Sequence, residues 1–131
     1  MKMRGLYLFF VVFLVFSQVV HAQTAPVSQI NAAFRSGDVS AIARYMDNVV
    51  DVTIANNQSA SSRTQAEMML RDFFAKNDPK GFEAQHSGNN EQNNTVFSIG
   101  YLSTPNGRFR VYILLKQQEG NYLLQEIRIE K

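Results

Sequence analysis

The chain has no cysteine among its 131 residues. It therefore forms no disulfide bond, and it has no thiolate ligand for a structural zinc site. A bacterial lipoprotein anchor is also excluded, because that anchor requires a lipidated cysteine after the leader. A domain of this composition has to be held together by its hydrophobic core alone, which is feasible at about one hundred residues.

The start of the chain has the composition of a secretory signal peptide over residues 1–22. Two basic residues lie within the first four positions, and a nearly continuous apolar run covers residues 6–20. Val20 and Ala22 suit the −3 and −1 positions, so we expect cleavage between Ala22 and Gln23. The alternative is an uncleaved membrane anchor, but the run is short for a bilayer span and is interrupted by Ser17 and Gln18. We expect an exported single domain at residues 23–131, either periplasmic or secreted.

The expected mature domain has neither a net charge nor a basic block. The whole chain has 13 Lys and Arg and 11 Asp and Glu residues, and losing Lys2 and Arg4 with the leader leaves 11 of each sign. A neutral domain without clustered cations argues against nucleic acid or an anionic membrane surface as partner. We therefore expect no nucleic-acid partner and no membrane association after cleavage.

Residues 94–130 alternate with a period of two, which predicts three antiparallel strands with one buried face. We expect the odd-numbered residues to be buried and the even-numbered ones to be mostly solvated. The odd set is Phe97, Ile99, Tyr101, Phe109, Val111, Ile113, Leu115, Leu123, Ile127 and Ile129. The even set includes Arg108, Arg110, Tyr112, Glu126, Arg128 and Glu130.

The segment 104–107 suits a type I turn followed by a left-handed glycine. Such a three-residue loop pairs Tyr101 with Val111. Gly100 then sits in the middle of a strand with Tyr112 across from it, and a strand glycine often marks a bend or bulge. We expect a strongly curved sheet, whose concave side suits a pocket.

A second turn lies near residues 119–121. If Gln118 pairs with Tyr122 across it, Arg110 lies opposite Glu130. The even face then has two interpretations that remain open. It is a solvated face whose ion pairs each contribute less than about 1 kcal/mol, or it is a self-association face, since Tyr and Arg are favoured at interface hot spots.

The residues before this region predict elements that cover one face of it. In order they are a bent pair of short helices (26–47), a strand (49–55), a polar loop (56–61), the longest helix (62–77) and a short strand (81–87). Ser62 and Gln65 form a capping box at the start of the longest helix. Phe82, Ala84 and His86 share one face of the short strand. This order predicts an α+β fold with helices on one side of a mostly antiparallel sheet.

Several segments carry a family resemblance: residues 33–38, 73–74, 79, 82, 86–88, 99–102, 107–112 and 127–130. Over essentially the whole mature chain, the sequence resembles exported bacterial proteins known as domain of unknown function 4783. That family lies within the nuclear-transport-factor-2-like superfamily, with ketosteroid isomerases and polyketide cyclases of the SnoaL type. The resemblance implies a cone-shaped α+β fold, a pocket between sheet and helices, and often a dimer through the outer sheet face. It implies no particular reaction.

Five residues are candidates for lining such a pocket: His86, Phe73, Tyr101, Tyr45 and Asp51. His86, the only histidine left after cleavage, lacks an evident orienting carboxylate, so a structural role is favoured over that of a base. Asp51 is favoured as a solvated strand residue. Phe73 is favoured as core, with one of the adjacent phenylalanines at the edge of a cavity. No catalytic residue, metal ligand or cofactor is predicted.

Three functions fit these features. The first is a non-enzymatic domain that binds a small apolar ligand or a protein between the sheet and the long helix, and it predicts an apolar cavity with few ionisable groups. The second is an isomerase-like or cyclase-like enzyme with His86 or Asp51 as base, which predicts a buried titratable group beside another polar group. The third is a cell-envelope assembly module, which predicts a filled cone and an apolar or tyrosine-rich outer face.

Overall fold

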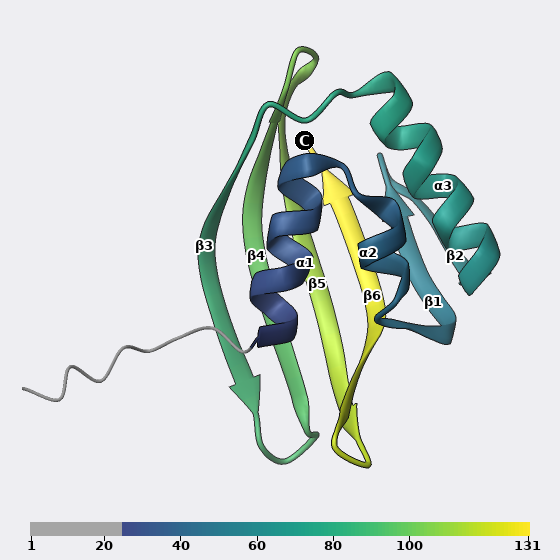
Figure 1. The fold of residues 1–131 in the computed structure, drawn as a ribbon, viewed down its shortest axis with the longest axis vertical. Helices are drawn as coiled ribbons and strands as arrows, with labels where there is room; N and C mark the ends of the chain where they lie inside the picture. Colours follow the sequence, from purple (N-terminus) through teal and green to yellow (C-terminus); the bar gives the residue numbers. More distant parts are fainter. Residues whose placement is uncertain (1–24) are drawn as a thin grey trace, which may run out of the picture.

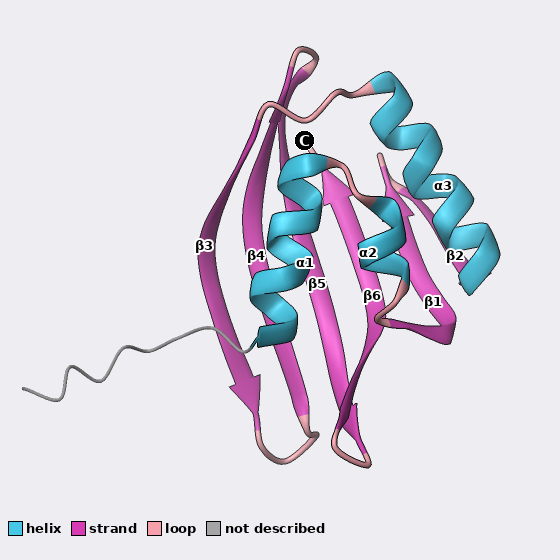
Figure 2. Cartoon of the chain, in the orientation of Figure 1, coloured by secondary structure: helices cyan, strands magenta, loops and turns pink. Residues whose placement is uncertain are grey.

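The computed structural model describes residues 25–131, so the leader predicted at residues 1–22 lies outside the described residues. Helices and strands combine in an α+β arrangement (Figure 1, Figure 2). The elements are α1 (Ala25–Ser36), α2 (Val39–Ala43), β1 (Met46–Ile54), β2 (Asn57–Ser62), α3 (Arg63–Lys76), β3 (Gly81–Asn90), β4 (Thr95–Thr104), β5 (Gly107–Gln118) and β6 (Asn121–Glu130). Among the described residues, no helix is long and apolar enough to cross a membrane.

The strands form one curved sheet in the order β2-β1-β6-β5-β4-β3. β1 runs parallel to β6, and the other neighbouring strands run antiparallel. The helices lie on one face of this sheet (Figure 1), with α1 packed on β3 and β4 and with α3 packed on β1 and β2. The α+β fold predicted from the order of elements is therefore confirmed.

Apolar side chains fill the space between the helices and the sheet. The largest fully buried ones are Val27, Ile30, Phe34, Ile42, Met46, Leu70, Leu102, Ile113, Leu115, Leu124, Ile127 and Ile129. The ring centroid of Phe34 lies 6.0 Å from the centroids of both Phe74 and Phe82, so α1, α3 and β3 meet at this ring. Each such side chain contributes about 1.5–3 kcal/mol on burial, and together they hold the helices to the sheet.

The capping box predicted for α3 is confirmed, and the structure adds further helix caps. The Gln65 N–H donates to Ser62 Oγ at 3.2 Å, and the Ser62 N–H donates to Gln65 Oε1 at 3.0 Å, which completes the capping box of α3. Asn77 is the C-cap of the same helix. Asp38 caps α2, where its Oδ1 accepts a hydrogen bond from the Ala41 N–H at 3.2 Å.

The segment 56–61, predicted as a polar loop, belongs mostly to strand β2, so that prediction was wrong. β2 pairs with β1 without interruption from Ile54–Asn57 to Val49–Ser62. Most of its side chains are exposed because it lies at the edge of the sheet. Backbone pairing holds such a strand in place, so its sequence needs no apolar alternation.

Strand β4 pairs with β5 one residue away from the predicted register. The loop has two residues, because Thr104 pairs with Gly107, and Tyr101 therefore lies opposite Arg110 instead of Val111. A shift of one residue turns every side chain to the other face of a sheet. The buried residues of β4 are Val96, Ser98, Gly100 and Leu102, whereas Phe97, Ile99 and Tyr101, which were predicted to be buried, are only half-buried on the opposite face.

The pairing of β5 with β6 matches the prediction far from the turn and differs at the turn. Arg110 lies opposite Glu130, as predicted, but Gln118 pairs with Asn121 instead of Tyr122. A register irregularity midway along the pair adds one residue to β6 and accounts for the difference. Such a bulge reverses the faces of the residues beyond it.

Gly100 lies beside a bulge, as the sequence predicted, but the side chain that covers it is a different one. Phe82 of β3, and not Tyr112, lies against this glycine, so that a Cβ added to Gly100 would be 2.3 Å from Phe82 Cζ. The register of β3 shifts between Ala84 and His86, next to the same glycine. The close approach of the ring to the backbone is what requires glycine at this position.

Gly100→Ala is expected to lower the free energy of unfolding by about 2 kcal/mol, because the new methyl group displaces a core ring. Gly81→Ala on β3 is the matched control, since an added Cβ there meets nothing within 4 Å. The control is expected to change stability by less than about 0.5 kcal/mol. Urea denaturation of both variants measures the difference, and equal stabilities would contradict this packing.

Candidate functional site

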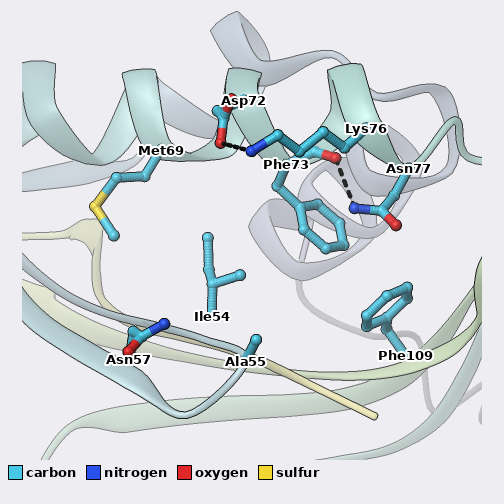
Figure 3. Close-up of a pocket in the computed structure, with 9 residues that line it drawn as sticks. All are labelled: Ile54, Ala55, Asn57, Met69, Asp72, Phe73, Lys76, Asn77 and Phe109. Carbon is cyan, nitrogen blue, oxygen red and sulfur yellow. Dashed lines mark hydrogen bonds and ion pairs between the residues drawn. The ribbon is translucent and has the colours of Figure 1, made fainter.

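A cavity of about 390 Å³ opens between α3 and the end of the sheet where β1 turns into β2 and β5 begins. Its apolar walls come from Ile54, Ala55, Met69, Phe73 and Phe109. The side chains of Ile54, Met69 and Phe73 point toward one shared space (Figure 3). We call this the α3 cavity. It lies at one end of the domain, beside the filled core.

Helical spacing explains the upper wall of the α3 cavity. Met69 and Phe73 lie four residues apart on α3, so they share one side of the helix. The Phe73 ring meets Phe109 edge-on, with 5.1 Å between centroids. Phe74 instead packs against Phe34 in the core. Phe73 is therefore the member of the adjacent pair that edges the cavity, as the sequence predicted for one of them.

Three of the four polar residues that line the α3 cavity have side chains that are already paired. Lys76 Nζ lies 3.0 Å from Asp72 Oδ2, and both side chains are largely exposed. Asn77 Nδ2 donates to the Phe73 carbonyl oxygen at 3.0 Å, and the fourth polar residue of the lining is Asn57. The ionisable residues of the lining are thus one ion pair facing solvent. Among residues 25–131, no group of three potential ligands is placed to hold a metal ion.

The lip of the α3 cavity is a two-residue turn with a left-handed backbone. Ala55 has a φ of 51° and Asn56 a φ of 68°, which makes the connection of β1 to β2 a type I′ turn. The Ala55 N–H donates to the Ile129 carbonyl oxygen at 3.1 Å. Asparagine tolerates this region, but a left-handed residue with an apolar Cβ costs about 1–2 kcal/mol. Backbone strain of this kind is common at binding sites.

Ala55→Gly is expected to raise the free energy of unfolding by about 0.5 kcal/mol, because glycine adopts a positive φ without strain. Ala60→Gly in β2, whose register with β1 is regular, is the control, and it is expected to lower stability by about 0.5–1 kcal/mol because glycine weakens an ordinary strand. Guanidinium denaturation compares the two variants. A loss of stability in Ala55→Gly would show that the turn stores no strain.

The structure does not bring the five candidate residues together. Phe73 lines the α3 cavity. Tyr45 lies in a hollow of about 600 Å³ between α1 and α2, where its hydroxyl donates to Gln29 Oε1. Tyr101, His86 and Asp51 lie on the face of the sheet turned away from the helices, which we call the outer face.

His86 does not share a face with Phe82 and Ala84, so that prediction was wrong. The bulge between Ala84 and His86 turns the histidine to the outer face, opposite Ile99 of β4. The His86 side chain is exposed, with its ring centroid 5.4 Å from that of Phe97. Among the described residues, no carboxylate forms a hydrogen bond with the His86 imidazole.

The register of β4 adds Phe97 and Tyr101 to the outer face, where the sequence predicted Tyr112 but not these two residues. Phe97 and Tyr112 stack with 6.4 Å between ring centroids. The Arg108 guanidinium lies 3.9 Å from the ring centroid of Tyr101, and that of Arg128 lies 5.3 Å from the centroid of Tyr112. Half-buried apolar rings thus alternate with arginines on this face. A prediction of the two-residue turn would have revealed them.

Electrostatics on the outer face follow from this crowding. Burial raises the pKa of the Tyr112 hydroxyl above its ordinary value, and the carboxylate of Glu126 raises it further, against the opposing effect of Arg128. Gln58 Nε2 donates to Asp51 Oδ2 at 2.9 Å. The other oxygen, Asp51 Oδ1, is buried and has no partner among the described residues. Because its pKa is raised above the ordinary value, the Tyr112 hydroxyl remains neutral at physiological pH.

Comparison with known proteins identifies the class and then the family. The solved structure of a variant of the protein named Rd1NTF2_05 has the same fold. Its TM-score is 0.61 at 15% identity, over 79% of this chain and 91% of that one. A polyketide cyclase homologue from Sinorhizobium meliloti aligns with a TM-score of 0.61 at 10% identity, over 80% and 93% of the two chains. The fold is thus nuclear-transport-factor-2-like, as the sequence predicted.

The sequence profile of the family described as domain of unknown function (DUF4783) matches residues 27–130, and the chain belongs to this family. A DUF4783 protein from Bacteroides ovatus is 32% identical, with a TM-score of 0.76 over 79% of this chain and 93% of that one. The predicted family is confirmed. No curated protein matches the sequence significantly.

Proposed function

We propose that this domain is a non-enzymatic binding protein that takes a small apolar or amphipathic ligand in the α3 cavity. The observation that carries the proposal is a cavity of about 390 Å³ with apolar walls, whose ionisable residues already pair with each other. Its volume falls within the usual range of ligand sites, about 300–1,000 Å³. From the leader, we further propose that the domain acts after export.

The chemistry of the cavity favours binding over catalysis. General acid–base catalysis needs a titratable side chain within hydrogen-bonding reach of the substrate. The ionisable residues lining the cavity are Asp72 and Lys76, which pair with each other in solvent. His86 and Asp51, the two candidate bases, lie on the outer face and not at this cavity. The enzyme hypothesis therefore has less support than the binding hypothesis.

Ile54→Trp is expected to block the α3 cavity, because Ile54 points into it (Figure 3). The probe is 1-anilinonaphthalene-8-sulfonate, an amphipathic dye whose fluorescence rises in apolar sites. We expect the substitution to weaken dye binding about tenfold, which corresponds to about 1.4 kcal/mol. Circular dichroism establishes that the variant is folded.

Val49→Trp is the matched control, since Val49 lies on the same strand but is 60% exposed and outside the cavity. It is expected to bind the dye as the unmodified protein does. The same loss in both variants, or no loss in either, would contradict a ligand site at the α3 cavity.

A second candidate function is self-association through the outer face. The observation that favours it is the cluster of half-buried apolar side chains there, formed by Phe97, Ile99, Tyr101, Tyr112 and Leu114. Contiguous apolar patches with aromatic residues and arginines are typical of protein interfaces. The filled core of the cone is also what an assembly module predicts.

Ile99→Lys is expected to convert a dimer into a monomer at about 100 µM, because it would bury an unpaired charge in the interface. Sedimentation velocity measures the mass. Ala75→Lys on the exposed side of α3 is the control and is expected to leave the dimer intact. A monomeric unmodified protein would rule out this second function.

A further inference from the structure

Strand β2 ends the sheet without the charges, proline or bulge that usually protect an edge strand. It pairs with β1 and has no second strand beside it among the described residues. Its six residues, Asn57–Ser62, contain no charge and no proline, and their register with β1 is regular throughout. Native proteins normally protect such edges with lysine, proline or a bulge. An unprotected edge in a folded domain is therefore a candidate for pairing with another strand.

The hairpin register identifies which backbone groups face the free edge. The two-residue turn makes Ile54 and Asn57 a hydrogen-bonded pair, and hydrogen-bonded and non-bonded pairs then alternate along the ladder. Gln58 and Ala60 therefore direct their N–H and C=O groups away from β1. Among the described residues, neither backbone makes a hydrogen bond to any other element. An extended chain lying beside β2 could form hydrogen bonds with these alternating donors and acceptors.

A groove runs along this edge and is closed on its other side by α3. Its volume is about 430 Å³, and its lining is Ser59, Ala60, Ser61, Gln65, Met68 and Met69. None of these residues is charged. Met68 is 65% exposed, one of two large apolar side chains among the described residues that are mainly in solvent. β2 and α3 lie beside each other in the fold (Figure 1).

We propose that an extended, uncharged peptide segment of a partner protein binds in this groove as an additional strand on β2, with an apolar side chain against Met68. Backbone hydrogen bonds to Gln58 and Ala60 supply affinity, and the methionine supplies selectivity, as in other cases of strand addition between an edge and a helix. The uncharged lining selects an uncharged segment, because a buried unpaired charge would be unfavourable. The proposal does not rest on the ligand proposed for the α3 cavity, although Met69 lines both sites.

The size of the edge favours a peptide over a second copy of this chain. A stable protein–protein interface buries about 1,200–2,000 Å². In this edge of six residues, Gln58, Ala60 and Ser62 direct backbone groups outward, and the Ser62 N–H is already held by Gln65 Oε1. Such an edge pairs with its own copy over a smaller area than that. A short peptide segment that binds transiently does not need to bury the area that a stable protein–protein interface buries.

The test uses a panel of acetylated and amidated hexapeptides in which threonine alternates with valine or leucine. Titration into the ¹⁵N-labelled protein is expected to shift the amide resonances of β2 and of the first turns of α3. Ala60→Pro removes the outward N–H without breaking the ladder to β1, since edge positions of this kind accept proline. We expect this variant to weaken binding about tenfold.

Met68→Lys tests the side-chain contact without touching the strand, so the proposal can be tested even if Ala60→Pro does not fold. It is expected to weaken binding about tenfold, whereas Ala75→Lys, which puts the same charge elsewhere on α3, is expected to bind normally. The proposal is overturned if no peptide in the panel binds at about 1 mM, if the shifts centre on another element, or if Met68→Lys binds normally. Concentration-dependent shifts of β2 without peptide would also overturn it, in favour of self-pairing.

Discussion

The two-residue turn between β4 and β5 determines which side chains meet the helices and which meet solvent. Because Thr104 pairs with Gly107, Gly100 faces the helices and leaves room for Phe82. That ring also stacks on Phe34 of α1, so the edge strand β3, the sheet and the helix layer are joined at one contact. The same turn directs the aromatic residues of β4 outward. Which side chains lie on each face of the sheet therefore depends on the register of β4 with β5.

Features that depend only on residues close together in the sequence could be predicted. The capping box of Ser62 and Gln65 is an example, because all of its hydrogen bonds lie within four residues. The alternation of β5 was also predictable, since this strand lies inside the sheet with its odd residues against the core. β2 was not predictable. An exposed edge strand gains its stability from backbone pairing with a partner, which leaves no apolar period in its own sequence.

Bulges limited the prediction of the candidate site. One extra residue in β6 puts Leu124 into the core where Leu123 was predicted, and one in β3 turns His86 to the outer face. A bulge is a property of two paired strands, so the period of one strand does not reveal it. Phe73 was found because helical spacing alone places it. Phe109 and Ile54 were missed as cavity residues because their positions depend on how distant strands end together.

Helix α3 and the β1–β2 hairpin link the two proposed binding sites physically. On α3, Met68 lines the edge groove, Phe73 lines the α3 cavity, and Met69 lines both. Asn57 begins the strand that carries the free edge, and the same residue lines the cavity. A strand added to β2 would extend the pairing of the same hairpin whose turn at Ala55 forms the lip of the cavity. If a peptide at the edge changes the affinity of the cavity for its ligand, that ligand changes the affinity of the edge for the peptide by the same factor.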